Sequence, residues 1–151
     1  MREILFRGQT RRFGEKVKNF AGDPMPSNWV YGGVCCGEGA FSIIYAYMDE
    51  EKEIPIEKHV VYTDTIGQYT GLTDKNGKKI FEGDIVEGHC HSQWSHRLQR
   101  CVVVYDRDGF ESRHYVKQGE VMRHYSYKVL FSRDVEVIGN IHDNPELLKG
   151  E

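Results

Sequence analysis

Short runs of apolar and β-branched residues, separated by turn-forming residues, recur along this chain and set its predicted architecture. Residues 40–48, 58–63 and 101–105 are the clearest runs, because aromatic and β-branched side chains dominate them. Further strands are predicted at 4–9, 29–31, 65–70, 80–81, 85–88, 110–112, 128–131 and 135–141. No long helical period is present, and only 144–148 has the pattern of a closing helical turn. The chain is therefore predicted to be mainly β.

The residues between two of these runs have the chemistry of tight turns. In Asp74-Lys75-Asn76-Gly77, the aspartate can accept hydrogen bonds from backbone N–H groups and the glycine can adopt a positive φ. A second turn follows at Gly83-Asp84, just before the next strand. We therefore predict structural turns at Asp74, Asn76, Gly77, Gly83 and Asp84, with adjacent antiparallel strands on both sides of the first turn.

The distribution of breakers and strands suggests two parts. Glycine and proline are concentrated between residues 22 and 39, which argues against a long regular element there. Strands with turns every 8–12 residues or so favour a sandwich or a small barrel, and residues 83–86 resemble the start of strands in small SH3-like barrels. We predict a smaller β-rich, loop-rich N-terminal lobe at 1–65. An SH3-like β-barrel domain is predicted at 66–148, with a long insertion loop near 115–127.

Two motifs resemble the signature of a known family. They are YTGLTDKNGKKIFEGDIV at 69–86 and VIGNIHDNPELL at 137–148, accompanied by a short N-terminal stretch at 2–7. Together they are similar to the YopX family, small proteins carried by phages and prophages of bacteria. The resemblance implies an accessory protein of a phage or prophage, and it implies no catalytic or ligand-binding residue.

Composition excludes several classes of protein. The chain has 151 residues, of which 39% are hydrophobic and 28% charged, so it can bury a core and is not predicted to be disordered. Its longest apolar stretch, at 40–48, is far shorter than the roughly 20 residues of a membrane helix, so no membrane contact is expected. No secretory signal pattern opens the sequence, which predicts a cytoplasmic location and four reduced thiols.

Histidine and cysteine residues suggest one weak metal site. His89, His91, His96 and Cys101 are residue types that zinc prefers. Their spacing is poor, because residues alternate between faces along a strand and no Cys-x-x-Cys pair is present. The prediction is therefore no metal, no cofactor and no catalytic residue. A cysteine nucleophile, Cys90 or Cys101 with a nearby histidine, stays open as an alternative.

Basic and aromatic residues alternate in the segment 89–128 and suggest a second alternative. Cations neutralise phosphates and bases stack on aromatic rings, although Asp106, Asp108, Glu111 and Glu120 dilute the positive charge and the net charge of the chain is −3. The candidate nucleic-acid or partner surface consists of Trp94, Arg97, Arg100, Arg113, Lys117 and Arg123.

The sequence leaves three functions in order of preference. The first is a non-enzymatic protein-interaction module that binds a host or phage protein, or forms a homo-oligomer through strand edges or exposed aromatic residues. The second is a nucleic-acid-binding SH3-like barrel, and the third is a metal- or cysteine-dependent hydrolase. A steep loss of binding with salt would favour the second, and stoichiometric zinc the third.

Overall fold

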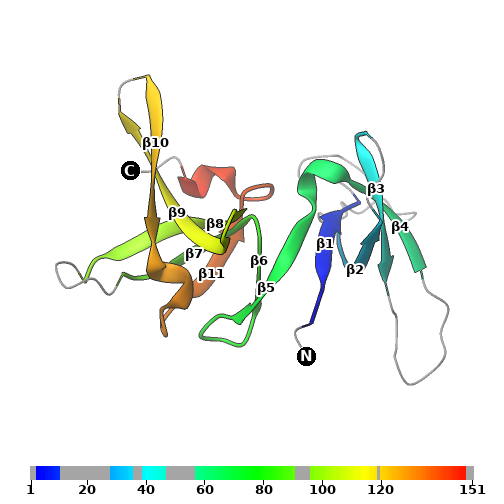
Figure 1. Ribbon diagram of the computed structural model, residues 1–151, viewed down its shortest axis with the longest axis horizontal. Coiled ribbons are helices and arrows are strands. Elements are labelled where there is room, and N and C mark those ends of the chain that lie inside the picture. Colours follow the sequence, from blue (N-terminus) through cyan, green and yellow to red (C-terminus); the bar gives the residue numbers. More distant parts are fainter. Residues whose placement is uncertain are drawn as a thin grey trace, which may run out of the picture. The chain divides into compact units, whose positions relative to one another are not determined.

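The protein consists of antiparallel β-sheets, as the sequence predicts. The computed structural model describes residues 3–10, 28–35, 39–46, 57–90, 96–118 and 120–148. The chain divides into two compact units, Met1–Tyr69 and Thr70–Glu151 (Figure 1). The sequence predicts the boundary between residues 65 and 66, and the division of the chain into two domains there stays a prediction. Within the described ranges, no helix has the length and apolar character needed to cross a membrane.

The first unit is built on one antiparallel sheet with the strand order β4-β3-β2-β1-β5. Its elements are β1 (Phe6–Gln9), β2 (Trp29–Cys35), β3 (Phe41–Ala46), β4 (Glu57–Tyr62), the 3-10 helix η1 (Thr63–Thr65) and β5 (Gly67–Thr73). Ile44 and Val61 are fully buried on one face of this sheet. Gly8 lies against them so closely that a Cβ atom there would stand 2.9 Å from Cγ2 of Val61, so the site admits only glycine without a shift.

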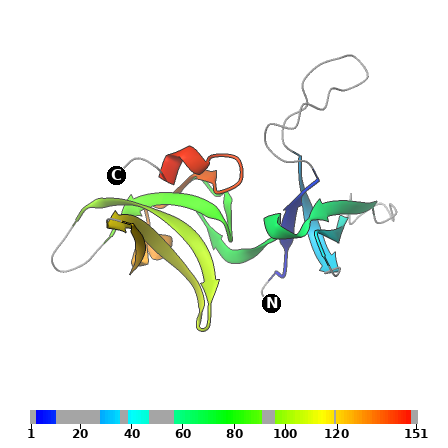
Figure 2. The same ribbon diagram turned by 90° about the horizontal axis from the view of Figure 1, so that it is seen from above.

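The second unit holds a five-stranded antiparallel sheet with the order β10-β9-β8-β7-β11. Its elements are β6 (Lys79–Phe81), β7 (Asp84–His89), β8 (Leu98–Asp106), β9 (Gly109–Gln118), β10 (Val121–Tyr127), η2 (Lys128–Phe131), β11 (Glu136–Asn140) and η3 (Pro145–Leu148). The predicted closing helical turn is η3, a 3-10 helix. Figure 2 shows η3 in red over this sheet, where Arg100 Nη1 donates to the carbonyl of Leu147 at 3.0 Å.

The core of the second unit lies between the sheet and η2. Val86, Cys101 and Val103 of the sheet are fully buried, and Val129 and Leu130 of η2 pack against them. Val86, Cys101 and Val103 lie on the same face, because Val86 pairs with Cys101 and residues two apart in a strand share a face. Ile80, Val135 and Val137 complete the cluster.

The predicted SH3-like barrel is not confirmed, because the sheet of the second unit is not closed among the described residues. Closure would require its first and last strands to pair, whereas β10 and β11 are the two ends of the strand order. The short strand β6 pairs with the end of β5 instead of extending this sheet. A barrel removes its edges and an open sheet keeps them, so each edge has to be accounted for separately.

The predicted insertion loop near 115–127 is wrong. That segment forms the end of β9 and all of β10, a regular hairpin in which seven residue pairs from Val121↔Gln118 to Tyr127↔Ser112 follow without a register shift. In Figure 1 this hairpin, coloured yellow to orange, rises beyond the other strands of the second unit. The segment is therefore an ordered projection with strand geometry.

Candidate functional site

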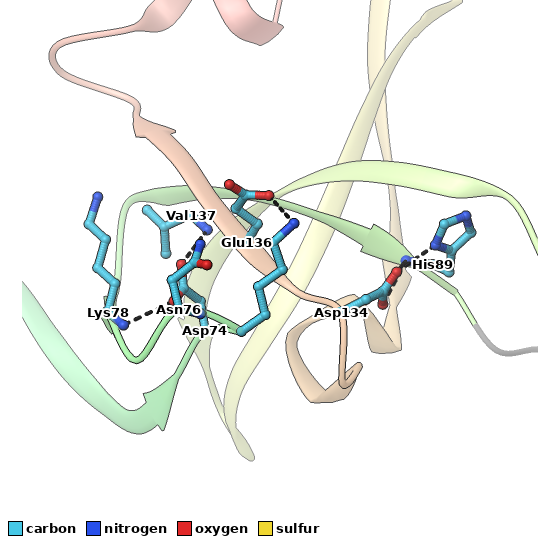
Figure 3. Close-up of polar contacts among 8 residues, drawn as sticks. Asp74, Asn76, Lys78, His89, Asp134, Glu136 and Val137 are labelled. Atoms are coloured by element: carbon cyan, nitrogen blue, oxygen red, sulfur yellow. Dashed lines mark hydrogen bonds and ion pairs between the residues drawn. The ribbon is translucent and has the colours of Figure 1, made fainter.

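The predicted turn at Asp74 is a hydrogen-bonded junction between two distant parts of the chain (Figure 3). Asp74 Oδ1 accepts the backbone N–H groups of Asn76 at 2.8 Å and Lys78 at 2.9 Å. Oδ2 accepts the N–H of Val137 in β11 at 3.1 Å, 63 residues away in sequence. The side chain thus holds the turn and joins it to β11.

This junction closes the outer edge of β11. The Val137 N–H is bound by the Asp74 carboxylate, and the Lys75 N–H donates to the carbonyl of Val135 at 2.9 Å. Lys75 also forms an ion pair with Glu136. Burial by itself would raise the pKa of Asp74, but the N–H groups of Val137, Lys78 and Asn76 hold that pKa below its ordinary value. The Asp74 turn of the motif at 69–86 therefore has a structural role.

Gly77 gives a direct test of the turn. Its φ is +81°, and a Cβ atom placed there would meet no other atom within 4 Å, so a side chain would cost backbone strain alone. Gly77→Val is expected to lower the free energy of unfolding by about 1–2 kcal/mol, because a β-branched residue resists a positive φ. Urea unfolding measures the change, and Gly77→Asn, which tolerates this conformation better, should cost less. An unchanged midpoint for the valine variant contradicts the assignment.

The second predicted turn also has a structural geometry. Gly83 has a φ of +84°, and its N–H donates to the carbonyl of Val103 at 2.8 Å. Asp84 is 1% exposed, and its Oδ2 accepts the N–H of Phe81 at 2.8 Å. These bonds fix the sharp change of direction between β6 and β7. The carboxylate of Asp84 therefore has a role that does not require chemistry on a ligand.

The weak metal candidates are not brought together. Cys101 pairs with Val86, three residues from His89, so the side chains of His89 and Cys101 lie on opposite faces of the sheet. His96 is exposed, and His91 lies outside the described residues. In the described ranges no three His, Cys, Asp or Glu side chains are grouped as metal ligands would be.

The thiol of Cys101 is poorly suited to be a nucleophile. It is fully buried, and burial, with a smaller contribution from Cys90, raises its pKa to about 12. Because the thiolate is the attacking species, such a group is almost entirely protonated at neutral pH. Cys101 is instead a small apolar residue of the core.

One cluster joins a serine, an aspartate and a histidine at the end of β7. Asp134 Oδ2 lies 2.5 Å from Nδ1 of His89, and the hydroxyl of Ser132 donates to Oδ1 of the same carboxylate. The hydrogen bonds from Ser132 and then His89 lower the pKa of Asp134. Serine activation requires the imidazole to contact the hydroxyl. Here the carboxylate stands between the imidazole and the hydroxyl. The arrangement therefore holds the end of β7 against residues 132–134 and does not generate a nucleophile.

Two cations of the predicted basic surface are neutralised within the second unit. Arg100 donates to Glu87 Oε2, on the neighbouring strand, from Nε at 3.3 Å and Nη2 at 3.0 Å. Arg113 forms ion pairs with Glu111 and Asp106. A guanidinium that is already paired with carboxylates is less available to a phosphate. The sequence does not show the partner of Arg100, which lies on the neighbouring strand, whereas Glu111 is only two residues from Arg113 in the same strand.

The other members of that surface lie on different elements. Arg97 is exposed just ahead of β8, Lys117 near the end of β9 and Arg123 on β10, and Trp94 lies outside the described residues. Nucleic-acid binding by these residues stays a prediction.

A hollow of about 420 Å³ lies at the β8–β9 turn. It is lined by Asp106, Arg107, Asp108, Gly109, Phe110 and Glu111. Two of its carboxylates already bind Arg113. The hollow is therefore a polar turn surface without a group that points to a particular ligand.

The outer edge of β10 is the most accessible binding feature of the second unit. β10 pairs only with β9 in the sheet, and six of its seven residues are exposed. Val121 and Met122 are each 59% exposed and Tyr125 43%. An edge strand with free backbone groups and exposed apolar side chains is a template for another strand. Within the described chain, no strand covers this edge.

Sequence reasoning missed this hairpin, and one signal could have found it. Gly119-Glu120 are two turn residues between the runs 110–118 and 121–127, which contain Tyr115, Val116, Val121 and Tyr125. Two strand-like runs separated by two residues that include glycine are typical of a hairpin. The polar residues around them hid that pattern.

The comparisons with known proteins identify a family and include a similar solved structure. The model of the family described as YopX protein matches residues 35–149 of the chain. No curated protein matches significantly. Among solved structures, the crystal structure of protein EF1440 from Enterococcus faecalis is 21% identical, with 98% of this chain and 99% of that chain covered and a TM-score of 0.45. The family match spans the β10 edge and both turns.

Proposed function

The chain belongs to the YopX family, and from that premise we propose that it is a non-enzymatic protein-interaction module whose binding site is the outer edge of β10. A partner adds a β-strand to this edge, with main-chain hydrogen bonds giving affinity and the neighbouring side chains giving selectivity. The protein is an accessory protein of a phage or prophage that acts in the cytoplasm, and its partner is a host or phage protein or a second copy of the chain.

The observation that carries the proposal is the difference between the two edges of one sheet. The β11 edge is occupied by the Asp74 turn, which binds the N–H of Val137 and the carbonyl of Val135. The β10 edge has little such protection among the described residues: it contains no proline, its register has no bulge, and Arg123 is the only Lys, Arg, Asp or Glu of its seven residues. Natural sheets usually protect an exposed edge with such features, so an unprotected edge favours a binding role.

The other two functions have less support. Nucleic-acid binding has less support because Arg100 and Arg113 are engaged in ion pairs within the chain. Among the described cations of the predicted surface, Arg97, Lys117 and Arg123 remain as candidates. A hydrolase has less support because Cys101, one of its two candidate nucleophiles, is fully buried. Both stay predictions, and the experiment below separates the nucleic-acid alternative from protein binding.

The test is affinity capture of the tagged full chain from its bacterial host, with and without nuclease, followed by quantitative mass spectrometry. Native chain is compared with His124→Pro and the matched His124→Thr, since both variants lose the imidazole and only proline alters the backbone of the edge. We expect the proline variant to recover the partner at least about tenfold less well, a difference of about 1.4 kcal/mol. The threonine variant keeps the backbone N–H, so it should recover clearly more of the partner than the proline variant.

Two results would contradict the proposal. Equal recovery by both variants would mean that the partner does not bind at β10. Broad recovery that nuclease abolishes would identify nucleic acid as the ligand and restore the basic residues as the site.

A further inference from the structure

The backbone geometry of β10 identifies which groups a partner strand meets. Gln118 pairs with Val121 across a two-residue loop, so these two residues are joined by the turn hydrogen bond. Hydrogen-bonded and non-bonded pairs then alternate along the hairpin. The N–H and C=O groups of Arg123 and Tyr125 are thus directed at β9, whereas those of Met122, His124 and Ser126 are directed outward.

From this geometry we propose that the strand added to β10 is β10 of a second copy of this chain, in an antiparallel pair with His124 on the two-fold axis. The inference rests on the proposed function, because it names the partner of the same edge. In this register His124 faces His124 of the other copy and Met122 faces Ser126, with each pair exchanging two main-chain hydrogen bonds. A closed two-fold dimer results, and the two sheets continue into one another.

The side chains of β10 are complementary to themselves in this register. Arg123 of one copy lies opposite Tyr125 of the other, which brings a guanidinium beside an aromatic ring. Val121 lies opposite Tyr127, which already packs against the core of its own unit. The exposed apolar surface of Val121 and Tyr125 is therefore covered by residues of the second copy.

Registers with the two-fold axis at a neighbouring residue are less favourable than the register centred on His124. A two-fold axis at Arg123 would place two guanidinium groups directly opposite one another, and like charges in that position are destabilising. An axis at Tyr125 would leave Val121 and Met122 beyond the paired length. Only the axis at His124 pairs all seven residues of β10, from Val121 to Tyr127.

The other two end strands in the described chain, β4 and β6, are less suited to a second copy. β6 has only three residues, two of them buried. β4 is an end strand of the first sheet, but it directly follows residues 47–56, which lie outside the described part of the chain. It also begins with the exposed charges of Glu57 and Lys58, and charged residues are a usual protection of an edge.

Sedimentation equilibrium of the full chain tests the dimer. The native chain is expected to have the mass of two chains at high concentration and to dissociate on dilution. His124→Thr keeps the outward N–H but loses the imidazole on the axis, so it is expected to dimerise more weakly than the native chain and more strongly than the proline variant. His124→Pro is expected to have the mass of one chain, because proline removes the outward N–H on the axis without removing a bond to β9. A native chain that keeps the mass of one chain at every concentration overturns the inference.

Cysteine cross-linking tests the register independently of any proline effect on folding. Residues of a hydrogen-bonded antiparallel pair have Cα atoms about 5.5 Å apart, within the range that a disulfide spans. His124→Cys is expected to form a covalent dimer under mild oxidation. Met122→Cys should not, since two copies of residue 122 would be more than about 13 Å apart. The native chain, with its four cysteines, gives the background.

The two cross-linking results have opposite meanings. A covalent dimer of His124→Cys in clear excess over Met122→Cys supports the proposed axis, and equal yields overturn it. If the native chain has the mass of one chain and capture still depends on the β10 edge, the second copy is excluded and the protein-binding function stands. If capture is also independent of that edge, both proposals fail.

Discussion

Asp74→Ala is expected to lower the free energy of unfolding by about 3–5 kcal/mol. The variant removes one acceptor group from three backbone N–H donors, those of Asn76, Lys78 and Val137, at a side chain that is only 6% exposed. The bond from Val137 is buried and the other two are partly buried, and a buried donor left without an acceptor costs about 1–3 kcal/mol. This is a large part of the 5–15 kcal/mol or so that stabilises most domains. Chemical denaturation at neutral pH measures the change.

The matched control for this prediction is Asp74→Asn. The amide keeps one oxygen for the turn and cannot accept the Val137 N–H with its nitrogen, so an intermediate loss is expected. Because the pKa of Asp74 is lowered from 3.8, its carboxylate stabilises the fold above the unfolded-state pKa, and this contribution is lost as the pH falls through the lower folded-state pKa. The native chain and the asparagine variant should therefore differ less at pH 3 than at pH 7. A constant difference would contradict the role of the charge.

Ser112→Val is expected to cost about 2–3 kcal/mol, the second largest effect. Ser112 is fully buried in β9, and its hydroxyl donates to the carbonyl of Tyr127 while it accepts the N–H of Leu130 at 3.1 Å. Valine neither donates nor accepts a hydrogen bond, and its two methyl groups have to fit where one hydroxyl was buried, which adds to the loss. The hydroxyl joins the end of β10 to η2, so its removal loosens the base of the β9–β10 hairpin.

Ser126→Val is the control for that substitution. Ser126 is on the exposed strand β10 and donates to Glu111 at 3.1 Å. An exposed substitution of this kind usually changes stability by no more than about 0.5 kcal/mol. Urea unfolding of the two variants gives the comparison, and equal midpoints would contradict the structural role of Ser112.

The turns were predictable from sequence because their chemistry is local. Asp74 and Gly77 act on residues within four positions, and a side-chain acceptor or a positive φ leaves a signal in the sequence itself. The bond from Val137 to Asp74 spans 63 residues and leaves no such signal. The local pairing of β5 with β6 across the Asp74 turn is likewise predictable, whereas the order of the open sheet, with β10 and β11 at its two ends, depends on which distant strands meet and leaves no local pattern.

The candidate site was the least predictable part of the molecule. An edge strand with little burial needs no alternation of apolar and polar residues, so Lys117, Glu120 and Arg123 made the hairpin resemble a loop. Arg100 belongs to the predicted partner surface because its partner Glu87, on the neighbouring strand, is not apparent from the sequence. Arg113 differs, since Glu111 is only two residues away and only its bond to Asp106 crosses to the next strand. For the hairpin and for Arg100 the missing information is the neighbour across the sheet.

The central claim is that the outward backbone groups of β10 bind a strand of a second copy. Residue-resolved hydrogen exchange of the full chain, in dilute and in concentrated solution, tests it most directly. We predict that the amides of Met122, His124 and Ser126 exchange fast when dilute and slow when concentrated, while those of Arg123 and Tyr125, bonded to β9, change little. Rates for Met122, His124 and Ser126 that do not depend on concentration would contradict the claim.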